Sequence, residues 1–133
     1  MNNSILLVDD DNIFNFLNKK VLVGMGVTDE IHVALNGNEA LKLLNSYFSG
    51  TQSFPRVIFL DLNMPIMDGF GFIEAFQRLN TTLNEKTLIV IVTSSQDPED
   101  IKRATALGIH HYITKPISEN AIRSVLEAAG VVV

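Results

Sequence analysis

Short runs of consecutive apolar residues alternate along this chain with longer segments whose apolar residues recur at helical spacing. The apolar runs cover residues 5–8, 31–35, 57–60, 88–92 and 109–113. Runs of this length, each followed by a helical pattern, are typical of strands in a parallel sheet whose crossover connections are helices, and the run 88–92 is apolar on both faces, as a central strand must be. The pattern therefore predicts an α/β domain in which each of five parallel strands is followed by a helix.

The predicted helices have recognisable boundaries. Asp11 is the expected N-cap of the first helix and Ser118 that of the last. Residues 97–100 combine a capping acid, a proline in the first turn and acids at the positive end of the helix dipole, so they predict the start of the fourth helix, which ends at Gly108. Asn36-Gly37 is typical of a hairpin, but the helical period after it favours a helix start. The first helix carries the apolar residues Ile13, Phe14, Phe16, Leu17, Val21 and Leu22.

Length and composition fit one folded unit. The chain has 133 residues, of which 47% are hydrophobic and 19% charged, as in an ordinary globular domain. There is no repeat, low-complexity tract or linker-like segment in the sequence. We therefore expect residues 1–133 to form a single domain without an output domain.

Charge and residue usage exclude several classes of function. The sequence has no cysteine, which excludes disulfides, thiolate metal sites and a cysteine nucleophile. A net charge of -5 disfavours nucleic acid as a direct partner. The N-terminal residues lack a basic region, and the apolar runs are too short to span a bilayer. We expect a cytoplasmic protein with no membrane contact.

Polar side chains follow the predicted strands at the points where they end. In an open parallel sheet, ligands bind outside the carboxyl ends of the strands, where the strand order reverses. The residues that four strands deliver to this rim are Asp9, Asp10, Asp11, Asp61, Thr93 and Lys115. The sequence thus predicts a polar site of carboxylates, a hydroxyl and an ammonium.

The gathered carboxylates need a compensating positive charge. Two carboxylates about 4 Å apart repel by roughly 4 kcal/mol at an effective dielectric constant of 20. A proton would relieve this repulsion, but Mg²⁺ does so better at neutral pH, since it binds carboxylates together with phosphate and water. The alternative is that residues 9–11 form only a solvated turn that caps a helix.

Asp61 is the candidate nucleophile of this site. A carboxylate beside a cation can attack a phosphoryl group and form a mixed anhydride. Lys115 and the hydroxyl of Thr93 would then hold the remaining phosphoryl oxygens. His110 and His111 are adjacent on a strand and point to opposite faces, and His32 stands alone on the second strand, so we interpret all three as structural.

Four segments resemble the receiver domains of two-component response regulators, of the single-domain chemotaxis type. They are residues 5–11, 59–69 (FLDLNMPIMDG), 92–94 (VTS) and 112–116 (YITKP), and they cover the chain nearly end to end. The resemblance implies a flavodoxin-like, doubly wound sheet with strand order 2-1-3-4-5 and five helices.

The resemblance also implies a role for each rim residue. Asp61 would be the phosphoacceptor, and Mg²⁺ would be held by Asp10, Asp61 and the backbone carbonyl of Asn63, with Asp9 acting through water. Thr93 and Lys115 would bind the phosphoryl group, the Lys115–Pro116 bond would be cis, and Tyr112 would be the aromatic residue that turns inward on activation. Asn63 and Ser95 occupy positions that tune phosphoryl lifetime in the family.

The implied function is that of a stand-alone response regulator. It would accept a phosphoryl group from a histidine kinase or histidine phosphotransfer protein, and would switch the surface around the fourth helix, fifth strand and fifth helix. That surface would bind a downstream protein, or the phosphoryl group would be passed on. Such a protein catalyses its own phosphorylation and hydrolysis but is not a turnover enzyme.

Three other functions would account for part of this pattern. A haloacid dehalogenase-type phosphatase also uses an aspartyl nucleophile, but needs a second acid two positions on, where this chain has Asn63. A flavodoxin-like cofactor binder would cradle phosphate in its first loop, where Asp9, Asp10 and Asp11 would repel it. A docking module that is never phosphorylated would not require the acceptor, metal and lysine positions that are intact here.

Overall fold

Five parallel strands form one sheet in the order β2-β1-β3-β4-β5. The computed structural model describes residues 4–28, 30–46, 55–79, 87–95 and 97–130. The strands are β1 (Ile5–Val8), β2 (Ile31–Ala34), β3 (Val57–Leu60), β4 (Leu88–Thr93) and β5 (His111–Thr114). All five predicted strands are present, and their parallel pairing and their order are confirmed.

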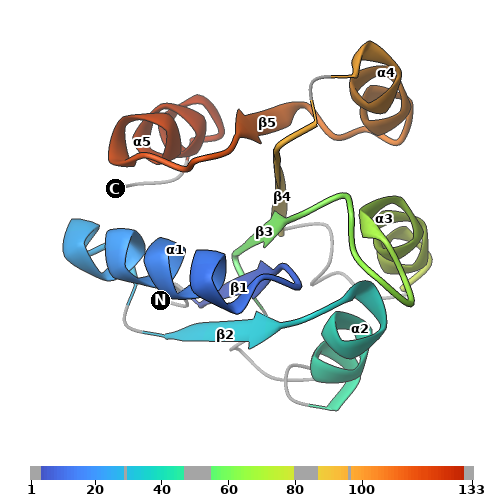
Figure 1. The fold of residues 1–133 in the computed structure, drawn as a ribbon, viewed down its shortest axis with the longest axis horizontal. Coiled ribbons are helices and arrows are strands. Elements are labelled where there is room, and N and C mark those ends of the chain that lie inside the picture. Colours follow the sequence, from blue (N-terminus) through green and yellow to red (C-terminus); the bar gives the residue numbers. More distant parts are fainter. Residues whose placement is uncertain (1–3, 29, 47–54, 80–86, 96, 131–133) are drawn as a thin grey trace.

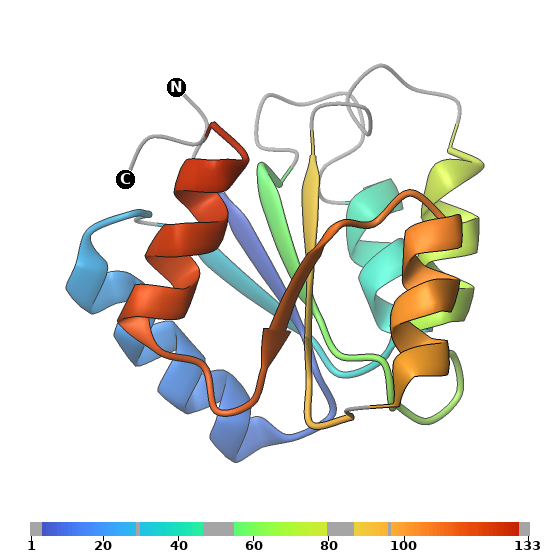
Figure 2. The same cartoon turned by 90° about the horizontal axis from the view of Figure 1, so that it is seen from above.

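Five helices cover the two faces of the sheet (Figures 1 and 2). They are α1 (Asn12–Met25), α2 (Gly37–Ser46), α3 (Gly69–Gln77), α4 (Pro98–Ala106) and α5 (Glu119–Ala128). Helices α1 and α5 lie on one face, whereas α2, α3 and α4 lie on the other. Each face has its own apolar core, because successive residues of the central strands alternate between the two sides.

The helix boundaries follow from local hydrogen bonds. The side chains of Asp11, Asp97 and Ser118 accept backbone N–H groups of the first helical turn, as predicted. Asn36 does the same for Glu39, which explains why Asn36-Gly37 starts a helix instead of forming a hairpin. The fifth strand begins at His111, not at residue 109, because the N–H of Ile109 still bonds to Ala104 at the end of α4.

Helix α1 is buried on a partly polar side and exposed on an apolar side. Asn15 and Asn18 are buried, and Phe14, Val21 and Leu22 pack with the core between the sheet and this helix. The exposed apolar residues of α1 are Ile13, Phe16, Leu17 and Val23. The apolar positions of this helix thus form two stripes, and only one of them faces the sheet.

None of the helices in the described ranges is long and apolar enough to cross a bilayer. The apolar tail, residues 131–133, lies outside the described residues.

Candidate functional site

The predicted site residues lie where the backbone ladder continues past the ends of the strands. The N–H of Asp9 donates to Ala34 (3.1 Å), that of Asp61 to Val8 (2.9 Å), and that of Lys115 to Thr93 (2.9 Å). These bonds fix the main chain of the residues that follow β1, β3 and β5. The side chains of Asp9, Asp61 and Lys115 therefore start from rigid positions at one rim of the sheet.

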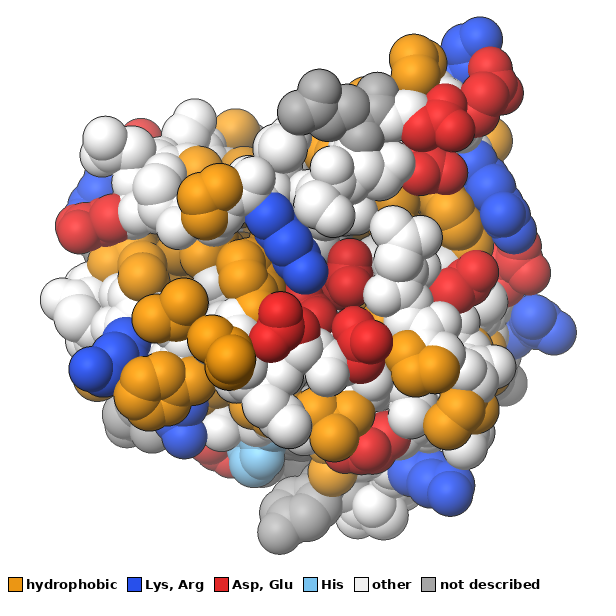
Figure 3. Space-filling view, in the orientation of Figure 1, with side chains coloured by type: hydrophobic (Ala, Val, Ile, Leu, Met, Phe, Trp, Pro, Cys, Tyr) orange, Lys and Arg blue, Asp and Glu red, His pale blue; other side chains and the backbone are white. Residues whose placement is uncertain are grey.

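Lys115 pairs with two buried carboxylates. Its Nζ lies 2.8 Å from Oδ2 of Asp9 and 3.7 Å from Oδ2 of Asp61. Asp9 and Asp61 are 4% and 6% exposed, so most of their hydration is lost and the ammonium replaces part of it. Figure 3 shows a basic side chain against a group of acidic side chains near the centre of this face.

Three carboxylates come close enough to share one cation. Asp9, Asp10 and Asp61 each place a carboxylate oxygen within 4.8 Å of the others. Asp9 and Asp61 are buried and Asp10 is exposed, so one side of the group opens to solvent. An all-oxygen donor set with an open side fits Mg²⁺, which binds few carboxylates and keeps several waters. The predicted role of the Asn63 carbonyl stays a prediction.

Burial changes the acidity of Asp61. Its pKa rises from 3.8 to about 6, chiefly through loss of hydration and then through repulsion from Asp9. The charge of Lys115 and the backbone N–H of Asn63 act in the opposite direction but do not cancel the rise. Without a cation, the ionised form of Asp61 is therefore destabilised by its surroundings.

Two residues that the sequence analysis did not assign hold this rim together. The side-chain amide of Asn15 donates to the carbonyl of Asp9 (2.8 Å), which ties α1 to the end of β1. A Cβ on Gly69 would lie 2.6 Å from the carbonyl oxygen of Asp61, so only glycine lets the start of α3 approach the end of β3 this closely. In the sequence, the Asp68-Gly69 pair was a signal for the contact between Gly69 and Asp61, but nothing indicated the hydrogen bond between Asn15 and Asp9.

The loop after β4 joins the rim to Tyr112. Thr93 is fully buried, and its hydroxyl oxygen accepts the N–H of Ser95 (3.2 Å). The carbonyl of Ser95 accepts a long hydrogen bond from the Tyr112 hydroxyl (3.4 Å). The hydroxyl of Ser95 donates to the carboxylate of Asp100 (2.6 Å). Burial, and then the charge of Asp100, raises the pKa of Tyr112. A movement of this loop would therefore reach both Thr93 and Tyr112.

Lys115 has one more neighbour besides the carboxylates. Its Nζ lies 4.2 Å from the ring centroid of Phe14, in the first turn of α1. The Lys115–Pro116 peptide bond that follows is cis, as predicted.

This fold and this rim define a class of protein. A doubly wound sheet that presents three carboxylates, a buried threonine and a lysine at its carboxyl edge is the arrangement of a phosphoryl-accepting receiver domain. Comparison with known proteins agrees. The chain belongs to the response regulator receiver domain family, whose family model matches residues 5–127.

Individual relatives match over most of their length. A two-component response regulator from Cytophaga hutchinsonii has a TM-score of 0.83 and 33% identity, with 95% of each chain covered. The "Probable methanogenesis regulatory protein FilR2" of Methanothrix harundinacea is 31% identical, over 92% of this chain and 78% of its own. The "Probable chemotaxis protein CheY" of Rhizobium etli is 28% identical, over 93% of this chain and 89% of its own.

Membership places the protein among the signalling switches of two-component systems. Phosphorylation on aspartate and dependence on Mg²⁺ are general features of receiver domains, as is contact with histidine kinases or phosphotransfer proteins.

Proposed function

We propose that this protein is a stand-alone response regulator that takes a phosphoryl group on Asp61 from a histidine kinase or histidine phosphotransfer protein. The observation that carries the proposal is the placement of Asp61, a buried carboxylate beside Asp9, Asp10 and Lys115. The matches to the Cytophaga and Rhizobium proteins, which are covered over most of their length, support a regulator of a single domain.

The proposed reaction is a single displacement at phosphorus. A carboxylate oxygen of Asp61 attacks the phosphoryl group, the bond from phosphorus to the donor imidazole nitrogen breaks, and an acyl phosphate forms on Asp61. Asp10, Asp61 and the Asn63 carbonyl would hold Mg²⁺, with Asp9 acting through water, and this cation supplies charge neutralisation when bound. Lys115 leaves Asp9 and binds a phosphoryl oxygen, which it can reach because Asp61 is already within 3.7 Å.

Thr93 and Tyr112 would convert this event into a change of surface. The Thr93 hydroxyl turns toward the phosphoryl group and gives up the N–H of Ser95, which frees the loop that Tyr112 also contacts. The surface of α4, β5 and α5 then changes, and a downstream protein reads it or the phosphoryl group is passed on. The ligand shifts this equilibrium only by its different affinity for the two states. Replacing Thr93 by alanine would leave Asp61 able to accept a phosphoryl group but weaken phosphorylation-dependent partner binding, and unchanged binding would contradict the coupling.

The direct test is intact-mass spectrometry after incubation with acetyl phosphate and Mg²⁺. We expect the mass of one added phosphoryl group, abolished by chelation with EDTA and by Asp61→Asn. A wild-type protein that gains no mass under these conditions would leave only the hypothesis of a docking module that is never phosphorylated. Repeated turnover of a phosphate ester would instead favour the phosphatase reading, against which Asn63 already argues.

A further inference from the structure

We propose that Phe14 is a positioning residue whose ring face holds the ammonium of Lys115 within reach of Asp61. The inference rests on the proposed function, since it concerns how Lys115 is kept ready for the phosphoryl group. It goes beyond that function, because the reaction itself requires only the charge of Lys115 and not an aromatic neighbour.

The geometry places the ring among the partners of the ammonium. Nζ of Lys115 lies 4.2 Å from the centroid of Phe14, within the range of about 6 Å over which a cation is attracted to an aromatic face. The same atom is 2.8 Å from Asp9 and 3.7 Å from Asp61. The lysine side chain is 19% exposed, so it is partly shielded from water. The ammonium thus sits between two carboxylates and one ring.

The ring is anchored to the same rim as the carboxylates. Phe14 lies in the first turn of α1, where its N–H donates to the carboxylate of the N-cap Asp11 (3.1 Å). The next residue, Asn15, donates from its side chain to the carbonyl of Asp9 (2.8 Å). The start of α1 and the end of β1 are therefore fixed to each other, and Phe14 is fixed with them.

An aromatic partner differs from a carboxylate when the site is loaded. A divalent cation held by Asp10 and Asp61, with Asp9 acting through water, would neutralise the charges that hold Lys115 in the free protein and would also repel the ammonium. The ring of Phe14 attracts a cation but neither titrates nor ligates Mg²⁺, so its hold on Lys115 persists. A lysine side chain has four flexible methylene groups, and this remaining contact limits the positions it can explore.

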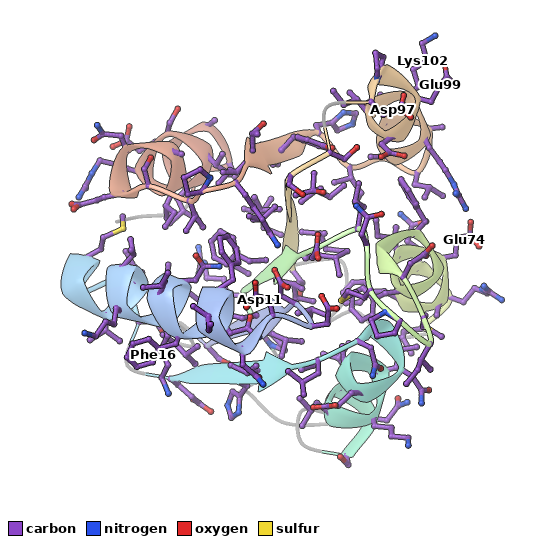
Figure 4. All side chains as sticks on the ribbon, viewed as in Figure 1. Asp11, Phe16, Glu74, Asp97, Glu99 and Lys102 are labelled. Atoms are coloured by element: carbon purple, nitrogen blue, oxygen red, sulfur yellow. The ribbon has the colours of Figure 1, made fainter. Side chains whose placement is uncertain are left out.

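A second aromatic residue on the same helix supplies a matched control. Phe16 also faces a lysine, with Nζ of Lys20 5.2 Å from its ring centroid, but it is 58% exposed. Figure 4 shows Phe16 farther along α1 than Asp11, which marks the helix start beside the site. Phe14→Leu and Phe16→Leu make the same chemical change, and only the first removes a ring from Lys115.

The first measurement is the rate of Asp61 phosphorylation at saturating acetyl phosphate and Mg²⁺. We expect Phe14→Leu to slow it by about 3- to 30-fold, the factor that corresponds to a partly desolvated cation–ring contact. The Kd for Mg²⁺ stays within about twofold, since no metal ligand is changed. Phe14→Trp and Phe14→Tyr keep a ring face and should therefore retain the wild-type rate. If Phe14 served only for packing, the larger tryptophan would not be expected to retain it. Phe14→Met replaces Phe14→Leu if the leucine variant does not fold.

The second measurement does not depend on phosphorylation. The ring should shift the ε-methylene protons of Lys115 upfield in an NMR spectrum of the free protein, and Phe14→Leu should remove this shift while Phe16→Leu leaves it unchanged. A wild-type rate in Phe14→Leu, or an unshifted Lys115 resonance in the wild type, overturns the inference and leaves the proposed function intact. A wild-type protein that accepts no phosphoryl group overturns the proposed function, and the inference with it.

Discussion

Asp61 should destabilise the metal-free protein at neutral pH, and its replacement by asparagine should therefore stabilise the fold. The pKa of Asp61 is raised from 3.8 to about 6, first by burial and second by the charge of Asp9. Because the pKa is higher in the folded state, the folded protein binds more protons than the unfolded chain between these two values. The contribution of Asp61 to stability is therefore most favourable below pH 4 and is lost as the pH rises through about 6.

The magnitude follows from the size of the shift. A rise from 3.8 to about 6 is about 2 pKa units, and each unit corresponds to about 1.4 kcal/mol, so ionised Asp61 costs about 3 kcal/mol. Asparagine has nearly the same shape and carries no charge. Asp61→Asn should therefore raise the free energy of unfolding by about 3 kcal/mol at pH 8 in EDTA, or the Tm by about 10 °C for a chain of 133 residues. At pH 4 the substitution should have almost no effect.

Urea unfolding between pH 4 and 8 in EDTA would measure this difference. Asp11→Asn is the matched control, since Asp11 is exposed and asparagine caps a helix about as well as aspartate does. Its effect should stay within about 0.5 kcal/mol at every pH. Adding Mg²⁺ should raise the Tm of the wild type more than that of Asp61→Asn. A stability difference that does not grow between pH 4 and 7 would refute the electrostatic account of this site.

Four further substitutions test local packing and backbone strain. Gly69→Ala should cost about 3 kcal/mol in urea unfolding, since its Cβ would lie 2.6 Å from the Asp61 carbonyl oxygen; Gly24→Ala, whose Cβ meets nothing within 4 Å, should instead add about 0.5–1 kcal/mol, and equal effects would contradict this. Asn18→Leu should add about 1 kcal/mol, because the buried Oδ1 of Asn18 has no hydrogen-bond partner among the described residues; a lower Tm would contradict this expectation. Ile66→Asn should add about 0.5–1 kcal/mol, because Ile66 is exposed and has a φ of 70°; an unchanged urea midpoint would show that the loop tolerates the branched side chain.

The strands and caps could be predicted because their signals are local. The length and the flanking residues of an apolar run such as 57–60 indicate a buried strand, and a capping aspartate needs only the N–H groups of the next turn. The placement of Asp9, Asp61 and Lys115 at one rim followed from topology alone, since parallel strands end at the same edge. The strand order itself came from the resemblance and not from the pattern.

The side of α1 that faces the sheet could not be read from the sequence. Its apolar positions form two stripes, and periodicity does not indicate which of them is buried. The side that faces the sheet carries Phe14, Val21 and Leu22 together with Asn15, whose side chain satisfies the carbonyl of Asp9 six residues earlier. The left-handed backbone conformation of Ile66 is likewise set by its loop, and it could not be predicted from the sequence because isoleucine rarely adopts it.

The distribution of charge within the rim explains why Asp61, and not Asp9, is suited to be the acceptor. Lys115 lies 2.8 Å from Asp9 but 3.7 Å from Asp61, so the shorter ion pair is formed by the carboxylate that is not the proposed nucleophile. Asp61 is left with the weaker partner and, in the metal-free protein, with a pKa raised to about 6 by burial and by the charge of Asp9. The destabilisation that Asp61 imposes on the free protein is the same electrostatic feature that would favour binding of a cation at the proposed acceptor.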